Sequence, residues 1–166
     1  WVHAHVAEHG GDPHRIFISG QSAGGHLVAL LALDGKHLKA LGLSPDHIKG
    51  VLAVSGVYNL AESIKGMDEF LLEPAFGEDA SKWPEAAPVT YVTGKHPPFL
   101  ITYADRDPLI LHRQAKMLHD ALKAKGADTQ LELIRGRNHI NEVLNIGQPD
   151  DPLTAVMLRF MKEKMR

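Results

Sequence analysis

Three side chains in this sequence have the types and the order that nucleophilic catalysis requires. Ser22 lies in Gly20-Gln21-Ser22-Ala23-Gly24, Asp107 follows an apolar run, and His139 comes last in a glycine-rich stretch. A serine hydroxyl is a poor nucleophile at neutral pH, because it needs a base to take its proton and an acid to fix the tautomer of that base. The sequence therefore predicts attack by Ser22, with His139 as the base and Asp107 as the acid.

The acid and the base each have a competing interpretation. Asp105 is an alternative acid, and Asp107 would also suit a turn or helix cap before Pro108. We favour Asp107 because it begins the loop that has to reach the histidine. His139 is one of 11 histidines. Its place in the loop after the last expected strand favours it as the base.

Three other histidines are interpreted as structural. His26 lies one helical turn beyond Ser22 and is expected to point along the helix. His5 and His9 have the i, i+4 spacing of a metal-binding pair, but no matching third ligand accompanies them. A solvated helix face is therefore the interpretation of this pair, and no metal site is predicted.

The residues around Ser22 predict a sharp turn between a strand and a helix. Arg15 to Ser19 form a short run typical of a buried strand, and an apolar run too long for a strand extends from the motif to about Leu33. In such a turn the serine has a strained backbone, and Gly20 and Gly24 are expected to avoid a Cβ clash where strand and helix nearly touch. The first N–H groups of the helix would point at an oxyanion beside the serine.

The rest of the chain alternates between strand and helix patterns. We expect strands at 50–55, 99–104 and 129–134, helices at 112–125 and 151–166, and a helix tail at 1–9. Between about 61 and 98 the periodicity weakens, which indicates a small cap-like excursion with one or two short helices. This alternation is typical of an α/β fold with a parallel sheet and helices on both faces, in which polar sites lie past the strand ends.

Composition restricts the function classes. A formal net charge of -2 argues against nucleic acid as a partner. No apolar run is long enough for a membrane span and no secretory leader is visible, so we expect a cytoplasmic location. The 166 residues contain no cysteine, which excludes disulfides, cysteine-ligated zinc and a cysteine nucleophile. Because Trp1 already lies in a helical pattern, the chain is expected to be a piece of a longer protein.

The residues from Gly10 to Ile16 and from Gly20 to Leu27 make the sequence similar to α/β-hydrolase-fold carboxylesterases. The group contains hormone-sensitive-lipase-like esterases, feruloyl and acetyl-xylan esterase-like enzymes and kynurenine formamidase. Further landmarks at 56–60, 87–89, 97–101 and 107–109 extend the resemblance over essentially the whole chain. The resemblance implies Ser22 as nucleophile, Asp107 as acid, His139 as base and the Ala23 backbone N–H as an oxyanion donor. It also implies a small-molecule ester substrate and no metal or organic cofactor.

The front of the fold departs from this group. Its members carry several strands and a His-Gly-Gly-Gly loop with further oxyanion donors before this point, whereas residues 8–12 match the turn before the elbow strand. We interpret residues 1–166 as a single α/β-hydrolase domain that is N-terminally incomplete, the C-terminal part of the fold. A homodimer or a missing N-terminal segment is expected to cover the bare edge of the elbow strand.

The function expected from the sequence is a serine esterase that hydrolyses small carboxylic esters through an acyl-enzyme on Ser22. Two alternatives stay open. The same groups would also hydrolyse an N-formyl or N-acyl amide, which a substrate panel distinguishes. A non-catalytic remnant or interaction module would keep the fold without activity, and a fluorophosphonate that labels Ser22 only in an assembled triad separates this alternative.

Overall fold

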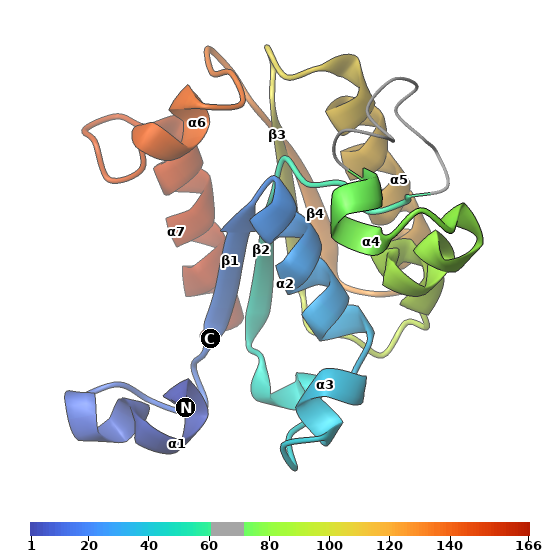
Figure 1. The fold of residues 1–166 in the computed structure, drawn as a ribbon. Coiled ribbons are helices and arrows are strands. Elements are labelled where there is room, and N and C mark those ends of the chain that lie inside the picture. The colour runs from blue at the N-terminus through green and yellow to red at the C-terminus, as the bar shows by residue number, and fades with distance from the viewer. Residues whose placement is uncertain (61–71) are drawn as a thin grey trace.

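The fold is built on a four-stranded parallel sheet, described by a computed structural model for residues 1–60 and 72–166 (Figure 1). The strands, in spatial order, are β1 (Phe17–Gln21), β2 (Gly50–Val54), β3 (Phe99–Ala104) and β4 (Thr129–Ile134). The α-helices are α1 (Val2–His5), α2 (Ala23–Leu33), α3 (Lys36–Lys39), α4 (Glu73–Phe76), α5 (Leu109–Ala124), α6 (Asn141–Leu144) and α7 (Pro152–Lys164). The 3-10 helices are η1 (Val6–His9), η2 (Pro45–His47), η4 (Ala80–Ala86) and η5 (Pro88–Tyr91). The predicted α/β class with a parallel sheet is confirmed.

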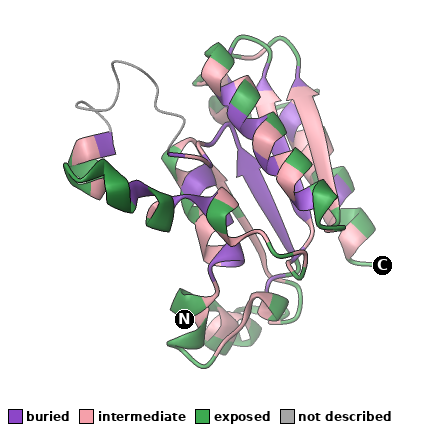
Figure 2. Ribbon diagram, turned by 90° about the vertical axis from the view of Figure 1, so that its right-hand side faces the viewer, coloured by how far each residue is buried: buried purple, intermediate pink, exposed green. Residues whose placement is uncertain are grey.

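Helices cover both faces of the sheet, because side chains alternate between the faces along each strand. Val51 and Ala53 of β2 belong to the buried cluster that includes Leu118 of α5 and Ala29 of α2. Their neighbour Leu52 faces the opposite way and joins the cluster around Phe160 of α7. Strand β2 is buried along its whole length, whereas the edge strands β1 and β4 are mostly of intermediate burial. Figure 2 shows helices with exposed outer surfaces around the sheet.

The two long helices after β3 and β4 follow their apolar spacing. Leu111, Ala115, Leu118 and Leu122 are buried along one side of α5. This helix begins three residues before the predicted boundary, and its added first turn carries the exposed Leu109 and the buried Leu111. At the start of α7, the Asp151 carboxylate accepts a hydrogen bond from the Thr154 N–H and caps the helix.

Strand β1 extends two residues further than the sequence predicted. Gly20 pairs with Ala53 and Gln21 with Val54, so the strand continues into the serine motif. Since the strands are parallel, their carboxyl ends meet at one edge of the sheet, and the segments that follow β1, β2, β3 and β4 begin there. This edge positions the candidate site.

The expected excursion at about 61–98 is described from Leu72 onward, and its part at 61–71 lies outside the described residues. The remainder contains three short helices, α4, η4 and η5, where the sequence predicted one or two. Leu72, Trp83 and Ala87 pack with Leu60 into a cluster of their own. Among the described residues, no helix is both long enough and apolar enough to cross a membrane.

Candidate functional site

Ser22 lies between β1 and α2 with a backbone conformation that L-residues rarely adopt, at φ 55° and ψ -115°. Its N–H donates to the Val54 carbonyl at 2.9 Å, and its own carbonyl accepts from the His26 N–H at 3.1 Å. Strain of this kind costs on the order of 1–3 kcal/mol and is concentrated at functional sites. The next residue, Ala23, begins α2, so its N–H has no acceptor in the preceding turn of the helix.

The glycines of the motif have different reasons for lacking a side chain. A Cβ on Gly20 would overlap the backbone of Gly24, so the predicted close approach at Gly20 is confirmed. The prediction for Gly24 is wrong, because a Cβ there would meet nothing within 4 Å. The second position that excludes a Cβ is Gly25, where it would lie 2.9 Å from the Val54 carbonyl oxygen of the neighbouring strand.

Asp107 is buried at the end of β3 and faces His139, with its Oδ1 3.1 Å from His139 Nδ1. Its other oxygen, Oδ2, accepts from the Ser55 hydroxyl at 2.6 Å and from the Ala104 N–H at 2.9 Å. Ser55 follows β2 and, like Ser22, has a positive φ, 46°. The carboxyl of Asp107 is therefore held from two strand ends and presented to the histidine ring.

Asp105, the alternative acid, contacts the loop before His139 instead of the ring. Its two oxygens accept from the backbone N–H groups of Gly136 at 2.9 Å and Arg137 at 3.1 Å. The hydrogen bond from Gly136 is the main reason that the pKa of Asp105 is lowered. Asp105 thus anchors the loop that carries His139.

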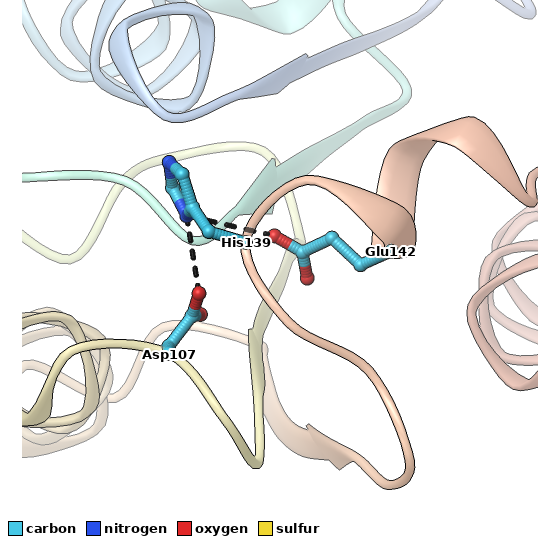
Figure 3. A group of neighbouring side chains, drawn as sticks. All are labelled: Asp107, His139 and Glu142. Carbon is cyan, nitrogen blue, oxygen red and sulfur yellow. Dashed lines mark hydrogen bonds and ion pairs between the residues drawn. The ribbon is translucent and has the colours of Figure 1, made fainter.

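The ring of His139 has a defined orientation (Figure 3). Because Nδ1 faces the Asp107 carboxyl, it is the nitrogen that carries the proton in the neutral ring, which leaves Nε2 as an acceptor. Nε2 lies 3.2 Å from Gln21 Nε2, and the same amide nitrogen donates to the His139 carbonyl at 2.8 Å. Ser22 Oγ makes no hydrogen bond within 1–60 and 72–166. The structure brings Asp107 and His139 together, and it connects His139 to the residue next to Ser22.

Glu142 is a third side chain at the ring that the sequence did not indicate. Its side chain is fully buried, and its Oε1 lies 3.9 Å from His139 Nδ1. Its Oε2 is buried without a hydrogen-bond partner among the described residues. Burial raises the pKa of Glu142 to about 7, and the nearby Asp107 carboxylate acts in the same direction.

Glu142 follows His139 by three residues and lies in the short helix α6, which the hydrophobic periodicity of the sequence does not predict. Ser55 gave a weak signal, as a polar residue at the end of an apolar strand, and Gln21 lies within the motif itself. The contacts of these residues depend on the tertiary structure.

Asp107, His139 and Glu142 offer ligand atoms that all lie within 4.8 Å of one another, a spacing compatible with a metal ion. The hydrogen bonds favour a different interpretation. Asp107 Oδ2 already accepts two hydrogen bonds, and His139 Nδ1 faces Asp107 as a donor, not as a lone pair. This donor set is that of an acid–base pair.

The side chains of two other histidines have defined contacts away from Ser22. His26 is buried, with Nδ1 2.8 Å from the Val57 carbonyl oxygen, and burial lowers its pKa. His5 is partly exposed and lies 3.0 Å from Glu8, not from a second histidine.

Comparison with known proteins gives consistent results. Esterase LipQ of Mycobacterium tuberculosis (strain ATCC 25618 / H37Rv) is 32% identical over 142 residues, which cover 78% of this chain and 33% of LipQ. The isoprenylcysteine alpha-carbonyl methylesterase ICME of Arabidopsis thaliana is 32% identical over 164 residues, 89% of this chain and 37% of ICME. The chain therefore spans about a third of the length of these curated relatives.

The solved structures that resemble this fold also include esterases. The crystal structure of an inhibited esterase B from Lactobacillus rhamnosis superposes with a TM-score of 0.79 at 23% identity, covering 99% of this chain and 58% of the esterase. The fold is accordingly that of the α/β-hydrolases. The BD-FAE family model matches residues 1–122. Since this match takes in well over half of the sequence, the chain belongs to the BD-FAE family.

Proposed function

We propose that this chain carries the catalytic groups of a serine esterase that hydrolyses small carboxylic esters, with Ser22 as nucleophile, His139 as base and Asp107 as acid. One observation carries the proposal: a buried, doubly hydrogen-bonded Asp107 holds His139 Nδ1 at 3.1 Å, at the same sheet edge as the strained Ser22. The esterase names of two relatives, LipQ and ICME, support the same reaction class.

The reaction begins when His139 Nε2 exchanges its contact with Gln21 for the hydroxyl of Ser22. Ser22 Oγ then attacks the ester carbonyl carbon while its proton passes to Nε2, and Asp107 stabilises the imidazolium that forms. The N–H of Ala23, at the positive end of α2, donates to the oxyanion. His139 next returns the proton to the departing alcohol, and a water activated by the same nitrogen hydrolyses the acyl-enzyme.

Hydrolysis of p-nitrophenyl acetate and butyrate by the 166-residue chain tests this proposal, with Ser22→Ala as the control. We expect hydrolysis that falls at least about 10³-fold in the variant, because the nucleophile is lost and only binding and oxyanion contacts remain. A fluorophosphonate should label the parent chain and not Ser22→Ala. Equal hydrolysis by both proteins would refute the role of Ser22.

Two alternatives give different results in the same experiments. An N-formyl or N-acyl amide hydrolase would label with fluorophosphonate and prefer amides over esters of the same acyl group. A non-catalytic module would neither label nor hydrolyse, although its folding would be intact by circular dichroism.

We further propose that the free edge of β1 is covered in the whole protein, either by a second copy of this chain or by a preceding segment. Within the described residues β1 pairs with β2 alone, and unpaired strand edges recruit partners. Sedimentation velocity tests this, since a monodisperse monomer of the 166-residue chain would contradict the homodimer.

The absence of cysteine is compatible with the cytoplasmic location that we also propose, and fractionation of the tagged protein tests it.

A further inference from the structure

The most unusual buried group outside the Ser22, His139 and Asp107 set is the carboxyl of Glu142. Burial of a carboxyl lowers the free energy of unfolding unless hydrogen bonds or opposite charges compensate for the lost hydration. Glu142 has little such compensation. Gln21 Nε2 reaches its Oε1 at 3.5 Å, the upper limit for a hydrogen bond, and Oε2 has no partner among the described residues.

The two carboxyls around His139 have very different surroundings. Asp107 accepts hydrogen bonds from Ser55, Ala104 and the ring itself. Glu142 has the weak contact with Gln21 and an interaction with the Ser55 side chain, and both act to lower its pKa against the larger effect of burial. Asp107 is thus fixed by three hydrogen bonds, whereas burial raises the pKa of the Glu142 carboxyl beside it.

The geometry nevertheless directs both acids at the same nitrogen. In Figure 3 the oxygens of Asp107 and Glu142 point at Nδ1 from two different segments, and the other ring nitrogen points away from both. Oε1 of Glu142 lies 3.9 Å from Nδ1, about 1 Å beyond a charge-assisted hydrogen bond. Because Glu142 and His139 are three residues apart in one short segment, a rotation of either side chain can close this distance.

We propose that Glu142 is a second acid for His139, a positioning residue that supports the imidazolium beside Asp107 and takes over the hydrogen bond from Nδ1 when Asp107 is absent. This inference rests on the proposed function. Among the described side chains, only Asp107 and Glu142 bring a carboxyl oxygen within 4 Å of a His139 ring nitrogen. The proposal predicts that the two acids compensate for one another, which a purely structural Glu142 would not do.

A double-mutant cycle tests the compensation. Ester hydrolysis at pH 8 is measured for the parent chain, Asp107→Ala, Glu142→Gln and the double variant. Loss of the acid from a serine triad costs about 10⁴-fold in rate when nothing replaces it. We expect Asp107→Ala to cost only about 10²-fold while Glu142 is present and about 10⁴-fold in the Glu142→Gln background. The same factor in both backgrounds would overturn the proposal.

Alanine is chosen at position 107 because an asparagine amide could itself donate to Nδ1 and enforce the wrong tautomer. Glu142→Gln keeps the shape of the buried side chain and replaces its carboxyl by an amide, which cannot ionise and has one acceptor oxygen fewer. Glu78→Gln, which removes a carboxyl from an exposed position, is the matched control and should leave both factors unchanged. Thermal unfolding of each variant identifies any that fails to fold.

A second measurement does not require catalysis, so it distinguishes failure of this proposal from failure of the proposed function. The proton on His139 Nδ1, when hydrogen-bonded to a carboxylate, gives a downfield resonance in a proton spectrum of the ¹⁵N-labelled chain. We expect this resonance to persist in Asp107→Ala and to disappear in the double variant. Its disappearance in Asp107→Ala alone, or its persistence in the double variant, would refute the role of Glu142.

If Asp107→Ala does not fold, the parent and Glu142→Gln are compared. An unchanged pH profile of fluorophosphonate labelling, together with an unshifted Nδ1 proton, would then also refute the role.

Discussion

Ionisation of Glu142 links the stability of this protein to pH in a direction opposite to that of most carboxyl groups. In the folded chain the pKa of Glu142 is about 7, against 4.5 for an ordinary glutamate. Between these two values the folded state holds a proton at Glu142 that the unfolded state has released. The free energy of unfolding therefore decreases as pH rises through this window, and the full penalty is present above about pH 7.

The size of the effect follows from the same two values. A difference of about 2.5 pKa units, at about 1.4 kcal/mol per unit, corresponds to a penalty of about 3 kcal/mol above the window. The Glu142 side chain is completely buried, so solvent screening does not greatly reduce this figure. Glu142→Gln cannot ionise. Its free energy of unfolding should accordingly rise relative to the parent chain by up to about 3 kcal/mol between pH 4.5 and pH 8.

Urea unfolding followed by circular dichroism, at half-unit pH steps and constant ionic strength, measures this difference. The titratable groups that interact with Glu142 include Asp107, His139 and the buried Tyr58. Both proteins retain all three, so the difference between the two curves reports the substitution at Glu142. Glu78→Gln controls for the loss of an exposed carboxyl and should follow the parent curve. If the curves of Glu142→Gln and the parent run parallel from pH 4.5 to pH 8, the elevated pKa and the reasoning built on it are wrong.

Five further substitutions test the serine turn, the loop that carries His139 and the packing of α7. Gly20→Ala should destabilise the chain by about 1–3 kcal/mol, because its Cβ would overlap the backbone of Gly24. Gly24→Ala places its Cβ in open space and should be neutral or stabilising by up to about 1 kcal/mol. Urea unfolding measures both changes. Asp105→Ala removes the acceptor of two loop N–H groups. Ester hydrolysis should fall about tenfold, because the loop that carries His139 loses its anchor, while the background rate measured with Ser22→Ala stays the same. Unchanged ester hydrolysis would contradict the anchoring role of Asp105. Phe160→Ala should cost about 3–5 kcal/mol by thermal unfolding, against less than about 0.5 kcal/mol for the exposed Leu158→Ala; similar costs would contradict the assigned packing of α7.

Much of the fold was predictable because its signals are local. The runs at 50–54, 99–104 and 129–134 are short and apolar or alternating, and they form β2, β3 and β4. The apolar spacing of α5 and α7 depends on residues three and four apart, so it is visible without knowledge of the partners that those residues contact. The strand, Gly-x-Ser-x-Gly motif and helix around Ser22 are also contiguous, and the strained serine conformation was expected from them.

The sequence by itself determined the order of Ser22, Asp107 and His139 and the strand ends at which they lie, because residue type and hydrophobic periodicity are properties of the chain. The sequence favoured Asp107 over Asp105 as the acid, and the tertiary structure shows how the two differ: the buried Asp107 faces the ring, whereas the exposed Asp105 accepts from loop N–H groups. The tertiary structure alone decided the contact of Gln21 with His139, 118 residues apart, and the burial of Glu142. Such contacts depend on where separate strand ends converge, and no periodicity within one segment encodes that convergence.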